Sequence, residues 1–171
     1  MFQKQPPKND IELWQKVFDQ ETAYIQARQD FLNNSPDRIG FIKKALHNPT
    51  ERGTALRLME YLKLEERQSL FDDLLELASV SQSDIELCRK AILSLPKNWL
   101  LANIEKSAEP LLQDGTDEEY RRLLELYLDI DRELVKRLAH RAVDHDDPDI
   151  REVGEDFQNY LENQHTILSA I

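Results

Sequence analysis

The stretch DDPDIREVGEDFQNYL, residues 146–161, decides the fold that the sequence predicts. It opens with two aspartates and a proline, which favour a turn and a helix start, and continues with apolar residues at helical spacing. Three earlier stretches share this plan: NPTERGTALRLMEYL at 48–62, SQSDIELCRKAILSL at 81–95 and DGTDEEYRRLLELYL at 114–128. Such self-similarity at a regular interval is typical of a solenoid built from helical repeats.

The four stretches align on the residue that we expect to pack against the preceding helix. These packing positions are Ala55, Ala91, Leu124 and Gly154, at successive steps of 36, 33 and 30 residues. We expect the apolar residue about one turn later to be buried too, and these residues are Met59, Leu95, Leu128 and Phe157. Further helical patterns lie between the stretches, at 36–47, 65–80, 97–113 and 132–145. The sequence therefore predicts four pairs of antiparallel helices joined by short turns.

Residues 36–161 resemble the HEAT family of α-solenoid repeats. The second helix of a HEAT repeat often opens with Asp or Pro, an apolar residue, Arg, two further residues and a small residue. That pattern is matched by Pro148, Asp149, Ile150, Arg151 and Gly154. The resemblance implies an all-α fold, a right-handed α-α superhelix of about four HEAT-like helix pairs.

Three arginines stand three residues before the packing position: Arg52, Arg121 and Arg151. The second stretch departs from this pattern, because Cys88 occupies the corresponding place. We expect the arginines to reach acidic residues or helix carbonyls of a neighbouring repeat and to form a structural ladder. The lone cysteine excludes an internal disulfide, and we expect it to act as a small packing residue.

Ahead of the repeats, residues 10–33 have the pattern of one long helix with a wide aromatic stripe. Trp14, Phe18, Ile25 and Leu32 lie near one face of it. A terminal solenoid repeat needs its exposed core covered, so we expect this helix to cap the first repeat. The alternative is a helix that binds a partner or dimerises. We expect residues 1–171 to form a single domain that ends in a short tail at 162–171.

Composition places the chain among helical globular proteins, with 40% hydrophobic and 32% charged residues. The apolar runs are too short for a transmembrane helix, and residues 1–10 contain no apolar signal core. We therefore expect a cytoplasmic protein with no membrane contact. The oligomeric state stays open.

Charge is the second informative feature, because the net charge of −11 is unevenly distributed. Residues 114–156 contain 15 Asp or Glu and 7 Lys or Arg, a net of −8, whereas residues 36–63 contain 3 and 6, a net of +3. An acidic chain repels the phosphate backbone, which argues against nucleic-acid binding. The acidic half instead favours a basic protein partner. The residues that we expect to contact that partner are Glu86, Arg122, Glu125, Glu152, Asp156 and Asn159.

The densest group of metal-ligand side chains is around His140, Asp144 and His145. The spacing does not fit an EF-hand loop, and a zinc site needs more His or Cys nearby, so we predict no metal and no cofactor. No phosphate-binding glycine loop or nucleophile motif occurs. We expect a non-catalytic adaptor or scaffold. The alternatives are an immunity-type protein that neutralises a basic toxin or enzyme, and a HEAT-like lyase or glycosylase.

Overall fold

The computed structural model describes residues 8–169, with side chains described for residues 9–163. The described part contains ten α-helices, a 3₁₀ turn and no strand. The helices are α1 (Lys8–Asn34), α2 (Arg38–Leu46), α3 (Arg52–Leu58), α4 (Leu64–Ser69), α5 (Phe71–Ala78), α6 (Ile85–Leu93), α7 (Lys97–Gln113), α8 (Asp117–Ile130), α9 (Arg132–Val143) and α10 (Pro148–Ser169), and the 3₁₀ turn is η1 (Met59–Tyr61). The predicted all-α class is confirmed.

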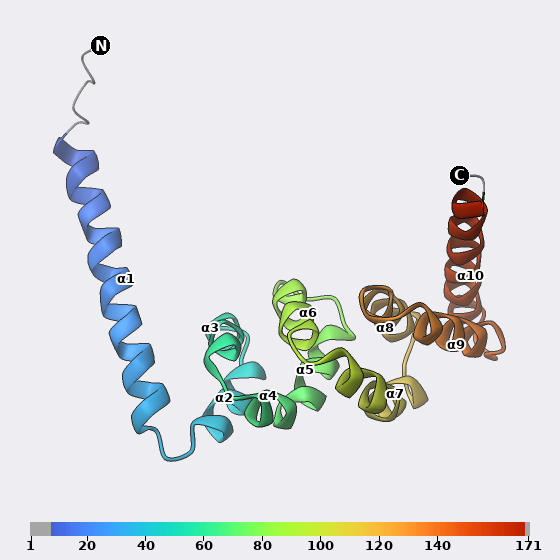
Figure 1. The fold of residues 1–171 in the computed structure, drawn as a ribbon, viewed down its shortest axis with the longest axis horizontal. Helices are drawn as coiled ribbons and strands as arrows, with labels where there is room; N and C mark the ends of the chain where they lie inside the picture. Colours follow the sequence, from blue (N-terminus) through green and yellow to red (C-terminus); the bar gives the residue numbers. More distant parts are fainter. Residues whose placement is uncertain (1–7, 170–171) are drawn as a thin grey trace, which may run out of the picture. The chain divides into compact units, whose positions relative to one another are not determined.

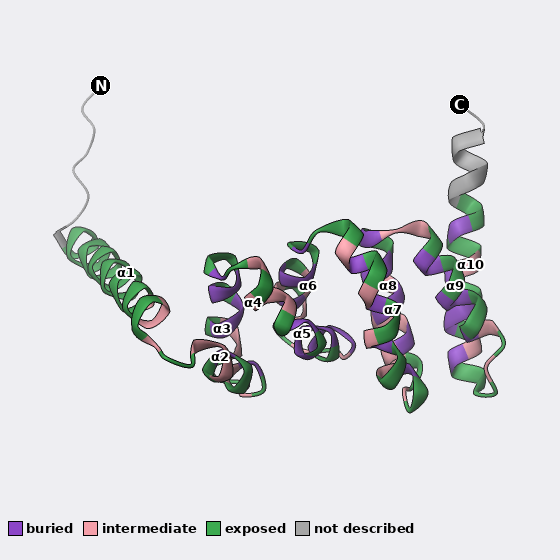
Figure 2. Cartoon of the chain, turned by 60° about the horizontal axis from the view of Figure 1, so that its bottom comes forward, coloured by how far each residue is buried: buried purple, intermediate pink, exposed green. Residues whose placement is uncertain are grey.

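The chain divides into two compact units, Met1–Phe41 and Ile42–Ile171. The single domain expected from the sequence stays a prediction. The first unit consists mainly of α1, the long helix expected at 10–33 (Figure 1). Most of its residues are exposed along its whole described length, as Figure 2 shows. The large apolar side chains of α1 are exposed too, and Trp14 is 69% exposed. The capping role expected for this helix stays a prediction.

The second unit is built from helices that pack on their neighbours. α5 contacts α6, α7 contacts α8, α8 contacts α9 and α9 contacts α10, so that consecutive helices of this part pack on each other. Contacts of α5 with α7 and of α6 with α8 connect helices that are not consecutive (Figure 1). The core lies between the helices (Figure 2) and is mainly leucine, with two fully buried tyrosines, Tyr120 and Tyr127.

The four packing positions chosen from the sequence, Ala55, Ala91, Leu124 and Gly154, are all buried. The residues one turn later are buried in three stretches, but Leu128 is 37% exposed. The expectation for Leu128 was wrong because the buried stripe of α8 continues through Tyr127 and Ile130. At 3.6 residues per turn, the residue after Tyr127 turns about 100° away from the core.

Several helix boundaries differ from the expected ones. The pattern at 65–80 is two helices, because the backbone at Leu70 leaves helical geometry with φ −99° and ψ 3° and separates α4 from α5. The second helix of the first repeat ends in the tighter η1 turn. α10 continues to Ser169, well past the expected end at residue 161, so most of the predicted 162–171 tail is helix. Residues 170–171 lie outside the described part.

Gly154 shows why a small residue stands at the packing position of the last pair. A Cβ atom built on Gly154 would lie 2.6 Å from the Val143 nitrogen and 2.8 Å from the Ala139 oxygen. Both atoms belong to the backbone of α9, so α10 approaches that backbone more closely than any side chain allows. The glycine is therefore required by the contact between the two helices.

A buried carboxylate ties α2 to α5. Asp73 accepts a hydrogen bond from His47 at 2.8 Å and forms an ion pair with Lys43 at 3.0 Å. Burial of a carboxylate is costly unless it is paired and hydrogen-bonded, and here both oxygens have a basic partner. These contacts fix the last turn of α2 against the first turn of α5.

Candidate functional site

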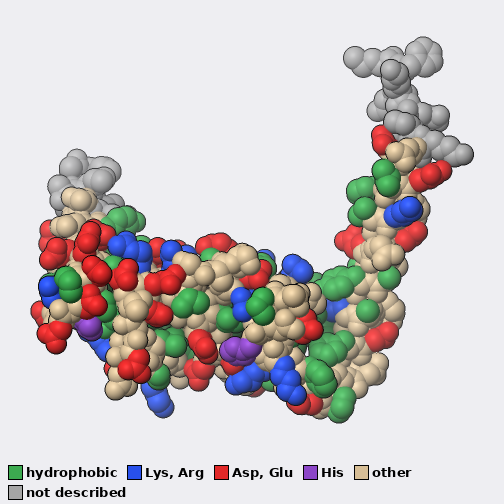
Figure 3. All heavy atoms as spheres, turned by 180° about the vertical axis from the view of Figure 1, so that it is seen from behind, with side chains coloured by type: hydrophobic (Ala, Val, Ile, Leu, Met, Phe, Trp, Pro, Cys, Tyr) green, Lys and Arg blue, Asp and Glu red, His purple; other side chains and the backbone are tan. Residues whose placement is uncertain are grey.

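The acidic surface expected from the sequence is concentrated in a smaller segment than expected. Residues 144–162, which are the turn before α10 and the first 15 residues of that helix, contain 8 Asp or Glu and 1 Arg, a net of −7. The rest of the second unit, residues 42–143, contains 19 Asp or Glu and 16 Lys or Arg, a net of −3. Figure 3 shows acidic side chains gathered at the end of this unit that carries α10, at the left.

Glu125 of α8, one of the expected partner contacts, is instead held by two arginines. Arg89 of α6 lies 2.5 Å from one of its oxygens, and Arg122 donates to both oxygens at 2.9 and 3.0 Å. Burial raises the pKa of Glu125, but the hydrogen bonds from Arg89 and Arg122 outweigh burial and leave the pKa below its ordinary value. Glu125 therefore joins α6 to α8, and reversing its charge would disturb the fold.

The neighbouring candidates Glu86 and Arg122 lie at the same junction. Glu86 is 81% exposed, and its carboxylate lies 3.4 Å from the Arg89 guanidinium, which is long for an ion pair. The two residues therefore form a loose pair at the surface. Arg122 also donates to the Ser81 hydroxyl at 3.1 Å. Beside it, Glu118 accepts the Ser81 N–H at 2.8 Å, and hydrogen bonds from Ser81 lower the pKa of Glu118. The carboxylates at the α6–α8 junction are thus largely compensated.

Two parallel ion pairs connect α9 to α7. Arg137 donates to both oxygens of Glu105 at 2.8 and 3.0 Å, and Arg141 donates to both oxygens of Glu109 at 2.6 and 3.0 Å. The hydrogen bond from Arg141 lowers the pKa of Glu109. The spacing of four residues on each helix aligns the pairs, and bidentate geometry makes them more specific than ordinary surface pairs. Within α9 itself, Lys136 pairs with Glu133 at 2.6 Å.

The remaining candidates lie on α10. Glu152, Asp156 and Asn159 are exposed and share one face at spacings of four and three residues. Asp156 is paired with Arg121 of α8 at 3.1 Å. Among the described side chains no ion pair reaches Glu152 or Glu155. The outer face of α10 and the turn before it therefore carry more acidic than basic residues, and we call residues 144–162 the acidic end.

The three arginines of the expected ladder make different contacts. Arg121 reaches the next helix pair through Asp156, whereas Arg52 donates to the Leu46 carbonyl at 2.7 Å and contacts Gln82. Arg151 donates to the carbonyls of His145 and Asp146 at 2.9 and 2.8 Å, within its own turn.

Three arginines make the same kind of contact with a backbone carbonyl. Arg38, Arg52 and Arg151 each donate to the carbonyl six residues earlier, at Leu32, Leu46 and His145 respectively. The last carbonyls of a helix have no partner within it, so a basic side chain there satisfies them. Sequence reasoning missed this spacing of six residues between the arginine and the carbonyl across a turn. The spacing would have added Arg38 to the group of structural arginines.

The histidines near α10 have local partners. His140 and Asp144 form an exposed pair at 3.0 Å. The His145 Nδ1 accepts the Asp147 N–H at 3.0 Å, and its ring lies edge-on to Tyr120. Across the described residues, no group of three or more His, Cys, Asp or Glu side chains is placed to hold a metal ion. Cys88 is buried, and burial raises the pKa of its thiol to about 11, so it is protonated at neutral pH.

A shallow groove of about 210 Å³ lies between α3, α4 and α6. Its floor is apolar, with Leu56, Met59, Leu87 and Ala91, and its rim is mixed in charge, with Arg57, Glu60, Arg67, Lys90 and Ser94. Arg67 is fixed across the groove by the Ser94 hydroxyl at 2.9 Å. The groove is smaller than typical small-molecule pockets of roughly 300–1,000 Å³ and suits a single side chain of a partner.

Comparison with known proteins finds no protein family, no curated protein and no solved structure that matches this chain. None of the helices in the described part is both long and apolar enough to span a membrane.

Proposed function

We propose that this chain is a non-catalytic protein-interaction module that presents its acidic end to a basic protein partner. The observation that carries the proposal is the charge of residues 144–162, with 8 acidic residues and 1 arginine. Exposed charge of one sign steers an oppositely charged protein and raises the association rate. Glu125 of α8 contributes less than the sequence suggested, because Arg89 and Arg122 already compensate it.

The helix pairs support a HEAT-like superhelix as the scaffold of this module. Consecutive helices from α5 to α10 pack on one another or on the next helix but one, and α10 meets α9 at a glycine in the position where HEAT repeats have a small residue. Repeat arrays of this kind offer extended surfaces for protein partners. An immunity-type protein that neutralises a basic toxin or enzyme is a special case of the same binding, and loss of the partner's activity on binding would identify it.

The test is an affinity capture from native lysate with two matched variants. Glu152→Lys with Glu155→Lys reverses two exposed carboxylates of the acidic end, and Glu65→Lys with Glu76→Lys reverses two exposed carboxylates of α4 and α5. We expect the first pair to lose the basic proteins that the wild type captures, and the second pair to keep them. Capture should also fall as salt rises, because exposed charges are screened within about 8 Å at physiological ionic strength.

Equal loss in both variants would mean that net charge alone drives the capture. An acidic captured partner would contradict the proposal directly.

A further inference from the structure

The shallow groove between α3, α4 and α6 has three cations on its rim, and we call it the cationic groove. Arg57 of α3, Arg67 of α4 and Lys90 of α6 line it, together with one carboxylate, Glu60. Among the described side chains, no ion pair reaches Arg57, Arg67 or Lys90. Three cations and one carboxylate give the rim a net charge of +2, although the whole chain has a net charge of −11.

These cations differ from the arginines that join helices elsewhere in the second unit. Arg89, Arg137 and Arg141 each have a carboxylate oxygen of another helix within 2.8 Å. Carboxylates are abundant in this chain, with 33 Asp or Glu against 22 Lys or Arg, and still none is paired with the cations of the groove. The rim is therefore available to carboxylates from another molecule.

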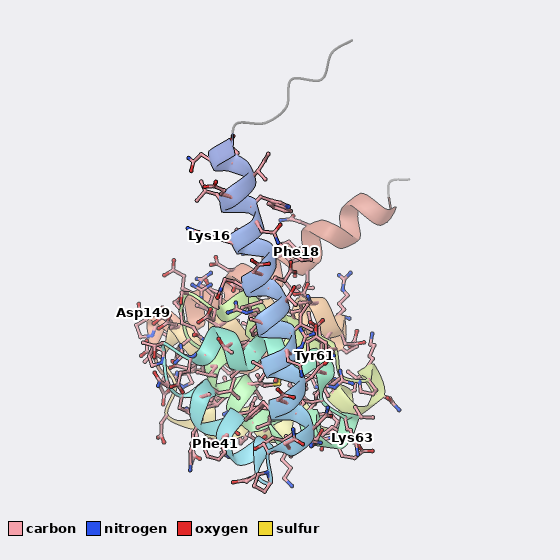
Figure 4. The ribbon with its side chains drawn as sticks, turned by 90° about the vertical axis from the view of Figure 1, so that its left-hand side faces the viewer. Lys16, Phe18, Phe41, Tyr61, Lys63 and Asp149 are labelled. Atoms are coloured by element: carbon pink, nitrogen blue, oxygen red, sulfur yellow. The ribbon has the colours of Figure 1, made fainter. Side chains whose placement is uncertain are left out.

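Arg67 is held in place by uncharged groups. One of its terminal nitrogens donates to the Ser94 carbonyl at 3.1 Å and to the Ser94 hydroxyl at 2.9 Å. Its Nε is buried and has no hydrogen-bond partner among the described residues. A further cation, Lys63, precedes Arg67 by four residues and is exposed at the surface (Figure 4). The α4 side of the groove is thus positive, and its charge is fixed but not neutralised.

The floor of the cationic groove limits what can enter it. Leu56, Met59 and Ala91 are buried and Leu87 is half-buried, so the floor is apolar. At about 210 Å³ the groove is below the roughly 300–1,000 Å³ of small-molecule pockets. A single aliphatic side chain fits there, and removing it from water favours binding.

A second, wider groove continues this surface across α6 towards α8. It has a volume of about 420 Å³ and shares Lys90 and Ser94 with the cationic groove. Its other lining residues are Glu86, Arg89, Leu93 and Asp129, so its two acids balance its two bases. Leu93 is 38% exposed and offers another apolar contact. A chain segment that passes Lys90 therefore finds a continuous surface, which a small ion does not need.

We propose that these two grooves bind an acidic segment of a protein partner. An apolar side chain of the segment enters the cationic groove, and carboxylates on either side of it pair with Arg57, Arg67 and Lys90. An apolar anchor surrounded by complementary charge gives both affinity and specificity. Single-stranded nucleic acid fits less well, because its bases stack on aromatic side chains and neither groove is lined by one.

This site is separate from the acidic end, and its partner has the opposite charge. With both sites occupied, the chain joins a basic protein to an acidic one.

The experiment measures binding of labelled synthetic peptides to the full chain by fluorescence anisotropy. The first peptide has a leucine between glutamates, the second has alanine in place of the leucine, and the third has lysines in place of the glutamates. The first peptide should bind about tenfold more tightly than the second, because the second buries less apolar surface. The affinity of the first peptide should also fall as salt rises.

Two double variants with the same change in net charge test the cations. Arg57→Glu with Lys90→Glu should weaken binding of the first peptide by roughly tenfold to a hundredfold. Lys106→Glu with Lys136→Glu is the matched control, because it reverses two exposed cations of α7 and α9 and should leave the affinity nearly unchanged. Circular dichroism during thermal unfolding checks that both variants keep the fold of the wild type.

The third peptide separates this site from the acidic end. Glu152→Lys with Glu155→Lys should abolish binding of the lysine peptide and leave the leucine–glutamate peptide bound. Arg57→Glu with Lys90→Glu should have the reverse effect. If the lysine peptide fails to bind the wild type, the function proposed for the acidic end is wrong, whereas the grooves are judged by the first peptide alone.

Several results would overturn the proposal for the grooves. Absence of binding of the first peptide up to about 1 mM excludes a useful site. Equal affinity for the leucine and alanine peptides shows that the floor is not used, and equal weakening by both double variants shows that only net charge matters. A single-stranded oligonucleotide that displaces the first peptide would assign the cations to phosphate. Self-association of the wild type that Arg57→Glu with Lys90→Glu abolishes would assign the grooves to a second copy.

Discussion

The two longest helices, α1 and α10, have similar sequence patterns and opposite surroundings. α1 has 27 residues and α10 has 22, and both carry an apolar stripe. Phe157 of α10 is 8% exposed, whereas Trp14 of α1 is 69% exposed. An amphipathic pattern therefore predicts that the apolar face of a helix is covered, but it does not identify what covers that face.

The two apolar stripes differ in the residues that they contain, and this difference bears on what covers each of them. The buried stripe of α10 is Ile150, Val153, Gly154, Phe157 and Leu161, with no charge and with a glycine where α9 comes closest. The stripe of α1 has Glu21 and Arg28 at its centre and no glycine. A glycine at the centre of the α10 stripe fits the backbone of a specific neighbour, α9.

The largest expected effect comes from truncating one phenylalanine in each helix. Phe157→Ala should lower the free energy of unfolding of the second unit by about 3 kcal/mol, because it leaves a cavity between α10 and its neighbours. Phe18→Ala should change that free energy by less than about 0.5 kcal/mol, because the ring is exposed.

The two tryptophans make this comparison measurable. Trp14 lies on α1, and Trp99 lies on α7 with its ring edge-on to Phe71 at 5.0 Å. In a Trp14→Phe background, fluorescence during denaturation reports on the second unit alone. Equal destabilisation by both truncations would show that α1 and the second unit unfold together, and would erase the distinction between the two helices.

A second comparison uses two helical glycines with different surroundings. Gly154→Ala should destabilise the protein by about 2–3 kcal/mol, because the new methyl group collides with the backbone of α9. Gly53→Ala in α3 should be neutral or stabilise by about 0.5–1 kcal/mol, because its Cβ meets nothing closer than 3.5 Å and alanine favours a helix. Urea denaturation of the two variants against wild type measures both effects. Tolerance of Gly154→Ala would mean that α9 and α10 are not in this close contact.

Much of the second unit could be predicted from the sequence because its helices bury periodic apolar residues. The repeat alignment located Ala55, Ala91, Leu124 and Gly154, and all four are buried. Leu128 was misplaced because both the third and the fourth residue after Leu124 fit a helical stripe, whereas the break at Leu70 is a local loss of helical geometry. One sequence cannot locate such departures, because several spacings of apolar residues fit a helix equally well.

The charged surface was less predictable, because pairing between helices depends on which side chains face each other. Glu125 has an exposed helical position in the sequence pattern, and its arginine partner on α6 is 36 residues away. Arg141 and Glu109 are 32 residues apart. The summed charge of a segment indicated an acidic half, and only the contacts show which of its carboxylates are paired between helices.

The smallest expected effect tests whether Glu125 joins α6 to α8 or serves as a free surface charge. Glu125→Gln should lower the free energy of unfolding by about 1 kcal/mol at neutral pH, since it weakens hydrogen bonds to two arginines. Glu86→Gln is the matched control, because Glu86 also pairs with Arg89 but is 81% exposed, and it should change stability by less than about 0.5 kcal/mol.

The pH dependence gives the sharper distinction for Glu125. Its pKa is lowered in the folded chain relative to the ordinary value of 4.5, so its stabilising contribution is complete above that value. As the pH falls from 4.5 through the lowered folded pKa, the carboxylate is protonated and the contribution is lost. The difference between wild type and Glu125→Gln, measured by urea denaturation at several pH values, should therefore be constant near neutrality and shrink below about pH 4.5. A difference that is already absent at pH 7 would mean that the two arginines contribute nothing through this carboxylate. Glu125 would then be an available part of the acidic surface, as the sequence first suggested.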